Sequence, residues 1–208
     1  MLLIGIVGGV ASGKSTVSNC FAKHGAAVLD ADRAGHEVLR EPAVMEAIRQ
    51  RWGEQVFDVG GNIARPAVAA IVFAKGGGVE KRFLEELTHP RIGKRLQEQS
   101  AELARKRVPV AILDAALLFE SGWSSLCGTV VFVDVPRDVR LDRVLGRGWS
   151  EADFRSREDW QWPAQEKRRW ADFIVDNSGS LERTSDQVRA IWQQLRKERF
   201  HEASLPAS

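Results

Sequence analysis

One glycine-rich segment constrains this chain more than any other feature. Residues 8–16 read Gly-Gly-Val-Ala-Ser-Gly-Lys-Ser-Thr and match the pattern G-x-x-x-x-G-K-[ST]. An apolar run, residues 2–7, precedes the segment, and residues at helical spacing follow it, namely Val17, Cys20, Phe21 and His24. A loop between a strand and a helix surrounds phosphate groups with backbone N–H groups and the positive end of the helix. This phosphate loop therefore predicts a binding site for a nucleoside triphosphate.

The residues of the phosphate loop are expected to act on the nucleotide in different ways. The glycines let successive backbone N–H groups turn towards an anion. Lys14 is a candidate catalytic residue that reaches the β- and γ-phosphates, and the Ser15 hydroxyl is expected to ligate Mg²⁺. The expected ATP contacts within the loop are Gly8, Ala11, Ser12, Gly13, Lys14, Ser15 and Thr16. The alternative is a glycine-rich turn with an incidental lysine.

Five short apolar runs predict buried strands, because none of them alternates apolar with polar residues. They are residues 2–7, 26–29, 108–113, 129–135 and 173–175. Charged stretches with helical spacing separate them, and strands that alternate with helices form mainly parallel sheets. We therefore expect a three-layer α/β fold of the P-loop NTPase type, with a five-stranded, mainly parallel sheet.

The chain is expected to form one domain over residues 1–200, with two additions to its core. The core comprises residues 1–32, 108–136 and 171–200, and a short tail follows at 201–208. A helical, substrate-binding insertion is expected over about residues 33–107, and a lid over about residues 137–170.

Helices are expected within the insertion and at the end of the chain. The ranges are residues 43–52, 66–73, 80–107 and 181–199, with a flexible connection at 76–78. Pro90 is expected to break the third of these helices, because proline disfavours helical geometry at the residue before it.

Composition argues against several classes of partner. The 30 basic and 28 acidic side chains leave a formal net charge of only +2. This balance gives no electrostatic reason to expect nucleic acid or a membrane. The apolar start has no basic region before it, so neither a signal peptide nor a membrane span is expected, and the protein should stay in the cytoplasm. Cys20 and Cys127 are too few and too far apart for a disulfide framework or a metal site.

Two carboxylates, Asp30 and Asp32, follow the second predicted strand. Ligands of open α/β sheets gather outside the carboxyl ends of the strands. A kinase needs a carboxylate there to orient the acceptor hydroxyl and take its proton. A turn or a helix cap is the alternative role for an aspartate in this position.

Arginines and tryptophans dominate the segment after the fourth predicted strand. Arg140, Arg143 and Arg147 lie at i, i+3 and i+7, so a helix would present all three on one face. Guanidinium groups suit phosphate oxygens, and Arg143 is the candidate catalytic arginine of a lid over ATP. A solvated face paired with Asp138 and Asp142 is the alternative. We expect the four tryptophans to pack the lid against the core rather than to stack nucleic-acid bases. They are Trp149, Trp160, Trp162 and Trp170.

Several segments together resemble the dephospho-CoA kinase family. They are residues 8–16, Val28–Asp32, Phe83–Pro90, Leu113–Glu120, Arg157–Gln161 and Glu166–Gly179. The likeness extends from residue 3 to about residue 195. It implies transfer of phosphate from ATP to the ribose 3′-hydroxyl of dephospho-CoA, the last step of coenzyme A synthesis, by a monomer or a weak homo-oligomer.

The resemblance also implies roles for individual residues. Asp32 becomes the candidate base, and Asn177 a contact of the adenine of ATP. Asp114 is expected to hold a metal-bound water, with a strand-end turn as the alternative. The remaining residues that the resemblance implies near the acceptor are His89, Arg91, Leu117, Glu120, Arg157 and Gln161. A capping or packing role remains the alternative for His89.

The chain departs from the family pattern at a few positions. Ala116 replaces a common proline, and Val10 and Ala11 replace the usual Ile-Gly in the phosphate loop. Ala64 precedes Arg65 where an aspartate is common, which puts an acceptor contact through that carboxylate in doubt.

Three other functions compete with the implied one. They are a P-loop kinase for another acceptor such as a nucleoside monophosphate, a nucleotide switch, and a nucleotide sensor without chemistry. A switch is disfavoured because no Asn-Lys-x-Asp segment is present.

Overall fold

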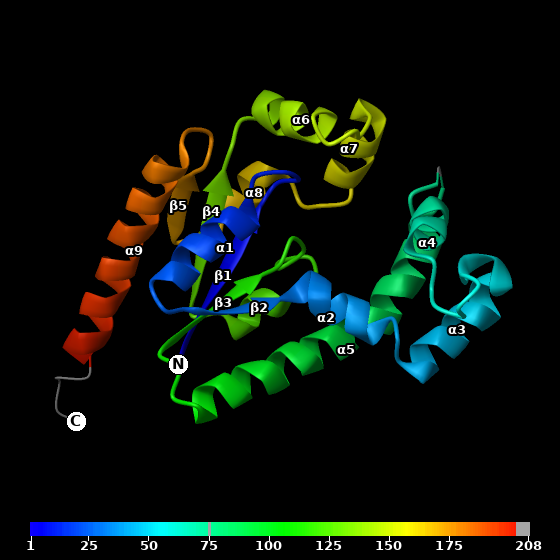
Figure 1. Ribbon diagram of the computed structural model, residues 1–208, viewed down its shortest axis with the longest axis horizontal. Coiled ribbons are helices and arrows are strands. Elements are labelled where there is room, and N and C mark those ends of the chain that lie inside the picture. Colours follow the sequence, from blue (N-terminus) through cyan, green and yellow to red (C-terminus); the bar gives the residue numbers. More distant parts are fainter. Residues whose placement is uncertain (75, 203–208) are drawn as a thin grey trace. The chain divides into compact units, whose positions relative to one another are not determined.

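The computed structural model of the chain describes residues 1–74 and 76–202 (Figure 1). The chain divides into two compact units. The larger unit comprises residues 1–29 together with the chain from Ser100 onward, and the smaller unit comprises Asp30–Gln99. Most of the predicted tail, residues 203–208, lies outside the described residues, while residues 201 and 202 belong to the last helix.

A five-stranded sheet forms the centre of the larger unit, in the order β2-β3-β1-β4-β5. The strands are β1 (Leu2–Gly8), β2 (Ala27–Asp30), β3 (Val110–Asp114), β4 (Thr129–Asp134) and β5 (Phe173–Asp176). β1 pairs in parallel with both β3 and β4, and β4 pairs in parallel with β5. The five predicted strands and the parallel α/β fold are therefore confirmed.

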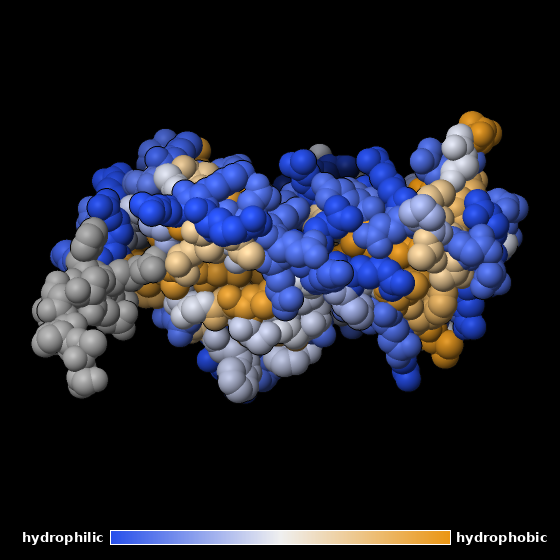
Figure 2. Space-filling view, turned by 90° about the horizontal axis from the view of Figure 1, so that it is seen from below, coloured by the Kyte–Doolittle hydropathy of each residue, from blue (hydrophilic) through white to orange (hydrophobic). Residues whose placement is uncertain are grey.

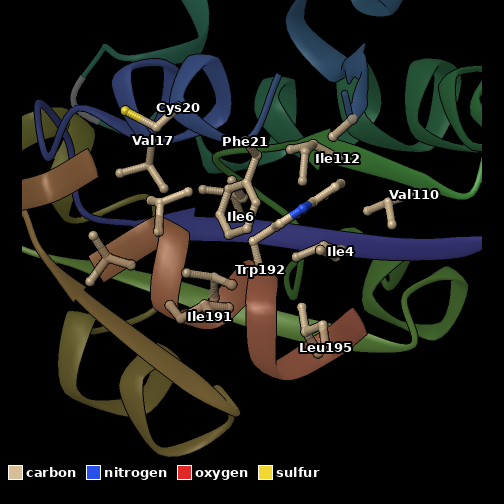
Figure 3. Packing of buried hydrophobic residues seen from close by; sticks show 14 of the residues in the cluster. Ile4, Ile6, Val17, Cys20, Phe21, Val110, Ile112, Ile191, Trp192 and Leu195 are labelled. Atoms are coloured by element: carbon tan, nitrogen blue, oxygen red, sulfur yellow. The ribbon is translucent and has the colours of Figure 1, made fainter. Parts of the chain in front are cut away.

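Two helices cover one face of the sheet, α1 (Lys14–Lys23) and α9 (Leu181–Glu202) (Figure 1). Ile4 and Ile6 of β1 are fully buried beneath them, and the Phe21 and Trp192 rings lie 6.4 Å apart (Figure 3). Side chains of this size each contribute roughly 1.5–3 kcal/mol when they leave water. This apolar layer fixes the start of α1, and with it the phosphate loop, against the sheet.

The other face of β1 is covered by the loop that follows β3. Gly5 lies so close to this loop that an added Cβ would come within 2.6 Å of Leu118 and 3.0 Å of Cys127. A glycine inside a strand commonly marks such a close approach of another segment. The loop after β3 is therefore packed directly on the central strand.

Three short helices follow β4: α6 (Arg137–Leu145), α7 (Glu151–Glu158) and α8 (Ala164–Arg169). Ser150 and Asp153 form a reciprocal capping box at the start of α7. The prediction that one helix carries Arg140, Arg143 and Arg147 is wrong for Arg147, because α6 ends at Leu145. Gly148 follows with a φ of 81°, a left-handed conformation that takes the chain out of the helix.

The tryptophans of this region do not share one environment. Trp149 packs against the cluster of Val10, Val144 and Phe154, as expected. Trp170 is 66% exposed, so the packing prediction is wrong for this residue.

The smaller unit is helical and its helices enclose a second, smaller set of buried apolar side chains. It contains α2 (Ala31–Val38), α3 (Pro42–Trp52), the 3₁₀ turn Glu54–Val56, α4 (Arg65–Val72) and most of α5 (Gly78–Arg105). A further 3₁₀ turn, Trp123–Leu126, belongs to the larger unit. The expected helices at 43–52, 66–73 and 80–107 are confirmed, whereas α2 was not predicted.

Pro90 does not break α5, so this prediction is wrong. Side chains bond to carbonyls near the proline, since Arg91 Nη1 donates to Leu87 O at 2.6 Å and Thr88 Oγ1 donates to Leu84 O at 2.7 Å. Proline removes only the backbone hydrogen bond to Glu86 O, and the remaining turns of this 28-residue helix hold its geometry.

The surface mixes hydrophilic and apolar residues on the face drawn in Figure 2. Among the described residues, no helix combines the length and the apolar character needed to cross a membrane. Cys20 and Cys127 are free thiols, as the sequence predicts. Burial raises the pKa of Cys127 to about 12, so this thiol stays protonated.

Candidate active site

The phosphate loop connects β1 to α1 through a backbone that favours glycine at two positions. Gly13 has a φ of 83° and is the N-cap of α1, and an added Cβ would collide with Asn177 Nδ2. At Gly8 an added Cβ would lie 2.5 Å from Ser12 Oγ and 2.8 Å from Val133 O. The two glycines of the sequence pattern are therefore required by close contacts within this unit.

Ala11 adopts a left-handed conformation with a φ of 60°. Left-handed geometry costs a residue with a Cβ roughly 1–2 kcal/mol relative to its preferred conformations. Glycine is usual at this position in the family that the sequence resembles. The phosphate loop of this chain therefore stores backbone strain that glycine would remove.

Arg143 and Asn177 hold the backbone carbonyls of the phosphate loop. Arg143 Nη1 donates to Ala11 O and Ser12 O, both at 3.3 Å, and its Nη2 donates to Asn177 O at 2.6 Å. Asn177 Nδ2 donates to Ser12 O at 2.8 Å, while its Oδ1 accepts from Thr184 Oγ1 at 2.9 Å. Because donors occupy these carbonyls, the peptide planes on either side of Ser12 are fixed.

Arg140 lies deeper than its neighbour, with a side chain that is 7% exposed. Its Nη1 donates to Val10 O at 3.1 Å and to Glu158 Oε1 at 2.8 Å, and its Nε donates to Val135 O at 3.2 Å. An added Cβ at Gly9 would come within 2.8 Å of this guanidinium group. Arg140 thus supports the outer turn of the phosphate loop, and its predicted contact with ATP stays a prediction.

Two oxygen groups near the start of α1 suit a small, hard cation. Ser15 is exposed in the first turn of α1. Asp114, the last residue of β3, accepts a hydrogen bond from Ser18 Oγ of α1 at 3.0 Å through Oδ2. Among the described residues, no group of three or more His, Cys, Asp or Glu side chains could hold a metal. A hydroxyl and a carboxylate fit a divalent ion that takes its other ligands from phosphates and water.

The two aspartates at the junction of β2 and α2 have different roles. Asp30 accepts a hydrogen bond from Arg33 N at 3.0 Å and is the N-cap of α2, so the capping alternative holds for this residue. Asp32 is exposed in the first turn of the same helix and does not cap it.

Glu120 and Gln161, both predicted from the family likeness, meet in one network. Lys167 Nζ lies 2.8 Å from Glu120 Oε1 and donates to Gln161 Oε1 at 3.3 Å. Glu120 Oε1 also accepts from Trp162 N at 2.7 Å. Sequence reasoning missed Lys167, because a lysine among charged residues of a short helix gives no signal of burial.

The other predicted site residues lie in several places. Arg157 has its guanidinium carbon 4.1 Å from the centroid of a Trp149 ring, and Arg147 is exposed beyond α6. His89 and Arg91 belong to the part of α5 within the smaller unit, and the mid-helix position of His89 excludes its capping role. Leu117 is half-buried in the loop after β3.

The parallel sheet and the phosphate loop between β1 and α1 define a P-loop kinase. A sequence model described as dephospho-CoA kinase matches residues 2–183. The chain therefore belongs to the dephospho-CoA kinase family, whose members phosphorylate dephospho-CoA with ATP in the final step of coenzyme A biosynthesis.

Similar proteins cover nearly the whole chain. A dephospho-CoA kinase of Aquifex aeolicus is 37% identical over 199 residues, which are 95% of this chain and 100% of the relative. The crystal structure of TT1252 from Thermus thermophilus is 34% identical, with a TM-score of 0.76 and coverage of 93% of this chain and 97% of its own. Dephospho-CoA kinase from Campylobacter jejuni is 25% identical, with a TM-score of 0.70 and coverage of 95% and 98%.

Proposed function

We propose that this chain transfers the γ-phosphoryl group of ATP to the ribose 3′-hydroxyl of dephospho-CoA in the cytoplasm, yielding coenzyme A and ADP. The observation that carries the proposal is the phosphate loop, which is held by partly buried hydrogen bonds from Arg143 and a buried one from Asn177. Family membership over residues 2–183 supplies the identity of the acceptor.

The nucleotide is bound by the phosphate loop, with Lys14 as the cation at the β- and γ-phosphates. Arg143 and Asn177 occupy the carbonyls of Ala11 and Ser12, and this holds the peptides of the loop that we propose as the phosphate site. Preorganised backbone donors stabilise the transition state because they do not reorient during the reaction. In this account Arg143 acts on the transferring group through the loop that it holds.

A divalent cation is expected with ATP, and we assign it as Mg²⁺. Ser15 would hold it through its hydroxyl, and Asp114 through a bound water. When bound, the ion neutralises charge on the β- and γ-phosphate oxygens.

Asp32 is proposed as the base that orients the acceptor hydroxyl. As the ribose oxygen bonds to the γ-phosphorus, the bond from that phosphorus to the bridging oxygen of ADP breaks, and the hydroxyl proton passes to Asp32. Asp32 follows the carboxyl end of β2 by two residues, a position where ligands of open α/β sheets gather. The further acceptor contacts that the family likeness supports are His89, Arg91, Leu117, Glu120, Arg157 and Gln161. We expect a monomer or a weak homo-oligomer.

The test is an acceptor panel. ADP production is followed with ATP and Mg²⁺ in the presence of dephospho-CoA, AMP, CMP or no acceptor, and the product is digested with a 3′-specific nucleotidase. We expect turnover with dephospho-CoA alone and a product that the nucleotidase converts back. Turnover with a nucleoside monophosphate would support kinase activity but would reject dephospho-CoA as the acceptor. No acceptor-dependent turnover would favour a switch or a sensor.

A further inference from the structure

Lys167 is a fully buried cation on a helix whose other charged residues face solvent. Its side chain has an exposed fraction of 0%, whereas Arg168 and Arg169 beside it are 44% and 73% exposed. Lysine is rarely buried completely unless it is paired. Burial lowers the pKa of the Lys167 ammonium group, and Glu120 opposes this shift. The contacts of the Lys167 ammonium group must therefore compensate for its loss of water.

The contacts of Lys167 join three segments of the larger unit. An ammonium group has three N–H donors, and Lys167 Nζ has three oxygen neighbours. They are Glu120 Oε1 at 2.8 Å, Ala116 O at 2.8 Å and Gln161 Oε1 at 3.3 Å. The first two belong to the loop after β3, and the third to the turn between α7 and α8. Lys167 of α8 therefore fixes both of these segments.

Glu120 receives its hydrogen bonds on one oxygen only. Oε1 contacts Lys167 Nζ and accepts from Trp162 N, whereas Oε2 is buried and has no hydrogen-bond partner among the described residues. The Glu120 side chain is 11% exposed. A buried carboxylate oxygen retains its full capacity to accept a hydrogen bond. The network thus orients one oxygen of Glu120 and leaves the other for a donor.

An aromatic pair belongs to the same network, since Phe119 precedes Glu120 in the sequence and Trp162 donates its backbone N–H to Glu120. Phe119 and Trp162 are stacked, with ring centroids 5.7 Å apart and an angle of 12° between their planes. Trp162 is 44% exposed, so part of its ring faces solvent although its backbone N–H binds Glu120. A carboxylate acceptor beside an exposed ring is suited to a ligand that has both an N–H or O–H donor and an aromatic base.

We propose that Lys167 is a positioning residue for acceptor binding, which holds Glu120 so that Oε2 accepts a hydrogen bond from an N–H or O–H group of the acceptor. The proposal rests on the proposed function, because the acceptor is taken to be dephospho-CoA. It makes Lys167 necessary for binding the acceptor and not for binding ATP.

Three variants separate positioning from simple structural support. Lys167→Met keeps the aliphatic volume and removes the cation, Glu120→Gln removes the anion, and the double variant removes both charges. A buried charge left without its partner is strongly destabilising, whereas neutralising both partners is often tolerated. The double variant is therefore expected to recover the urea midpoint of unfolding that Lys167→Met loses.

The decisive readout is the KM for each substrate. We expect Lys167→Met and the double variant to raise the KM for dephospho-CoA by about 10- to 100-fold, the range for losing a hydrogen bond to a charged group. The KM for ATP should stay within about twofold, since Lys167 makes none of the recorded contacts with the phosphate loop. Arg169→Met, which removes an exposed cation from the same helix, is the matched control and should leave both KM values unchanged.

Two results would overturn the proposal. One is a double variant that regains both the wild-type unfolding midpoint and the wild-type KM for dephospho-CoA, which would make the pair purely structural. The other is an equal rise in the KM for ATP. If Lys167→Met does not fold, the double variant and Glu120→Gln decide the question by the same readout. Wild-type enzyme in the same assay shows separately whether the proposed function itself holds.

Discussion

The two compact units of this protein differ in the polar contacts of their buried and exposed side chains. In the larger unit, polar groups around the phosphate loop are buried, among them Arg140, Asn177 and Thr184. In the smaller unit, charged groups pair at the surface: Arg95 contacts Glu37 and Glu41, with side chains that are 32–34% exposed. The larger unit therefore specifies the shape of a binding loop, while the smaller unit gains modest support from solvent-screened contacts.

This difference has an energetic consequence. Removing one partner of a buried hydrogen bond leaves the other without water, which costs about 1–3 kcal/mol and more for a charged group. An exposed ion pair contributes about 0.2–1 kcal/mol and weakens with salt. The effects of substitutions in the two units should accordingly differ in size and in salt dependence.

The largest effect is expected for Arg143→Ala, which removes the donor to three backbone carbonyls of the nucleotide site. The loop peptides lose their fixed orientation, and kcat/KM for ATP should fall by about 100- to 1,000-fold, as for other preorganised donors. Steady-state kinetics with ATP varied provides the measurement. Arg95→Ala in the smaller unit is the control, with an expected change below about threefold at the same salt concentration. A similar loss of kcat/KM in Arg143→Ala and Arg95→Ala would show that the two units do not differ in this way.

Asn177→Ala is expected to have the next largest effect. It leaves Ser12 O with a single side-chain donor, Arg143, and it leaves the buried Thr184 hydroxyl with only the longer contact to Ser180 O at 3.3 Å. The free energy of unfolding should fall by about 1–3 kcal/mol, and the KM for ATP should rise. Urea denaturation measures the first quantity. Asn62→Ala, at an exposed position of the smaller unit, should change neither; an unchanged midpoint for Asn177→Ala would show that the loop needs no such support.

Ala11→Gly should sharpen the comparison by stabilising the larger unit. Glycine removes the strain of a φ of 60°, although it also increases the freedom of the unfolded chain, so a net gain of about 1 kcal/mol is expected. Arg107→Gly is the matched control, because Arg107 has a φ of 58° outside the phosphate loop. Both variants should unfold at higher urea concentration, and only Ala11→Gly should alter the KM for ATP. If Ala11→Gly unfolds at a lower urea concentration than the wild type, the backbone at Ala11 is not strained.

The smallest effect is expected for Glu80→Gln in the smaller unit. Hydrogen bonds from Arg51 and then Trp52 lower the pKa of Glu80 from 4.5 to about 2. A carboxyl group whose folded pKa is depressed stabilises the protein above its unfolded pKa and loses this contribution as pH falls through the folded value. Wild type should therefore exceed the variant in thermal midpoint at about pH 7, and the gap should narrow below about pH 4.5.

Glu98→Gln, which removes the partner of a long exposed pair with Lys94, is the control for this series. The thermal midpoint of Glu98→Gln should differ little from that of the wild type at any pH. If the difference in thermal midpoint between wild type and Glu80→Gln widens as the pH falls, the ionised Glu80 carboxylate does not stabilise the folded protein.

Sequence analysis predicted the parts of the molecule that local patterns determine. Five continuous apolar runs became the five strands, and the glycines of the phosphate loop lie where close contacts require them. Helix α5 continues through Pro90 because the surrounding helix overrides the preference of one residue. Short-range preference alone therefore placed most elements, but it missed α2, broke α5 at Pro90 and extended α6 to Arg147.

The contacts that hold the site depend on long-range packing, which the sequence does not display. Arg143 and Asn177 meet at Ser12 although more than 30 residues separate them, and Lys167 finds Glu120 across 47 residues (167 minus 120). Nothing in the local pattern distinguishes Lys167 from the exposed cations beside it. The roles of Asp32, Ser15 and Asp114 likewise stay predictions, because they concern ligands.

The role of Asp32 as the base is tested by comparing Asp32→Asn with the wild type in single-turnover phosphoryl transfer from ATP to dephospho-CoA. Because the phosphate loop of the larger unit binds ATP and Asp32 takes the acceptor proton, we expect transfer in the variant to be at least about 100-fold slower, with equilibrium binding of ATP unchanged. A variant that transfers phosphate at the wild-type rate would show that Asp32 is not the base.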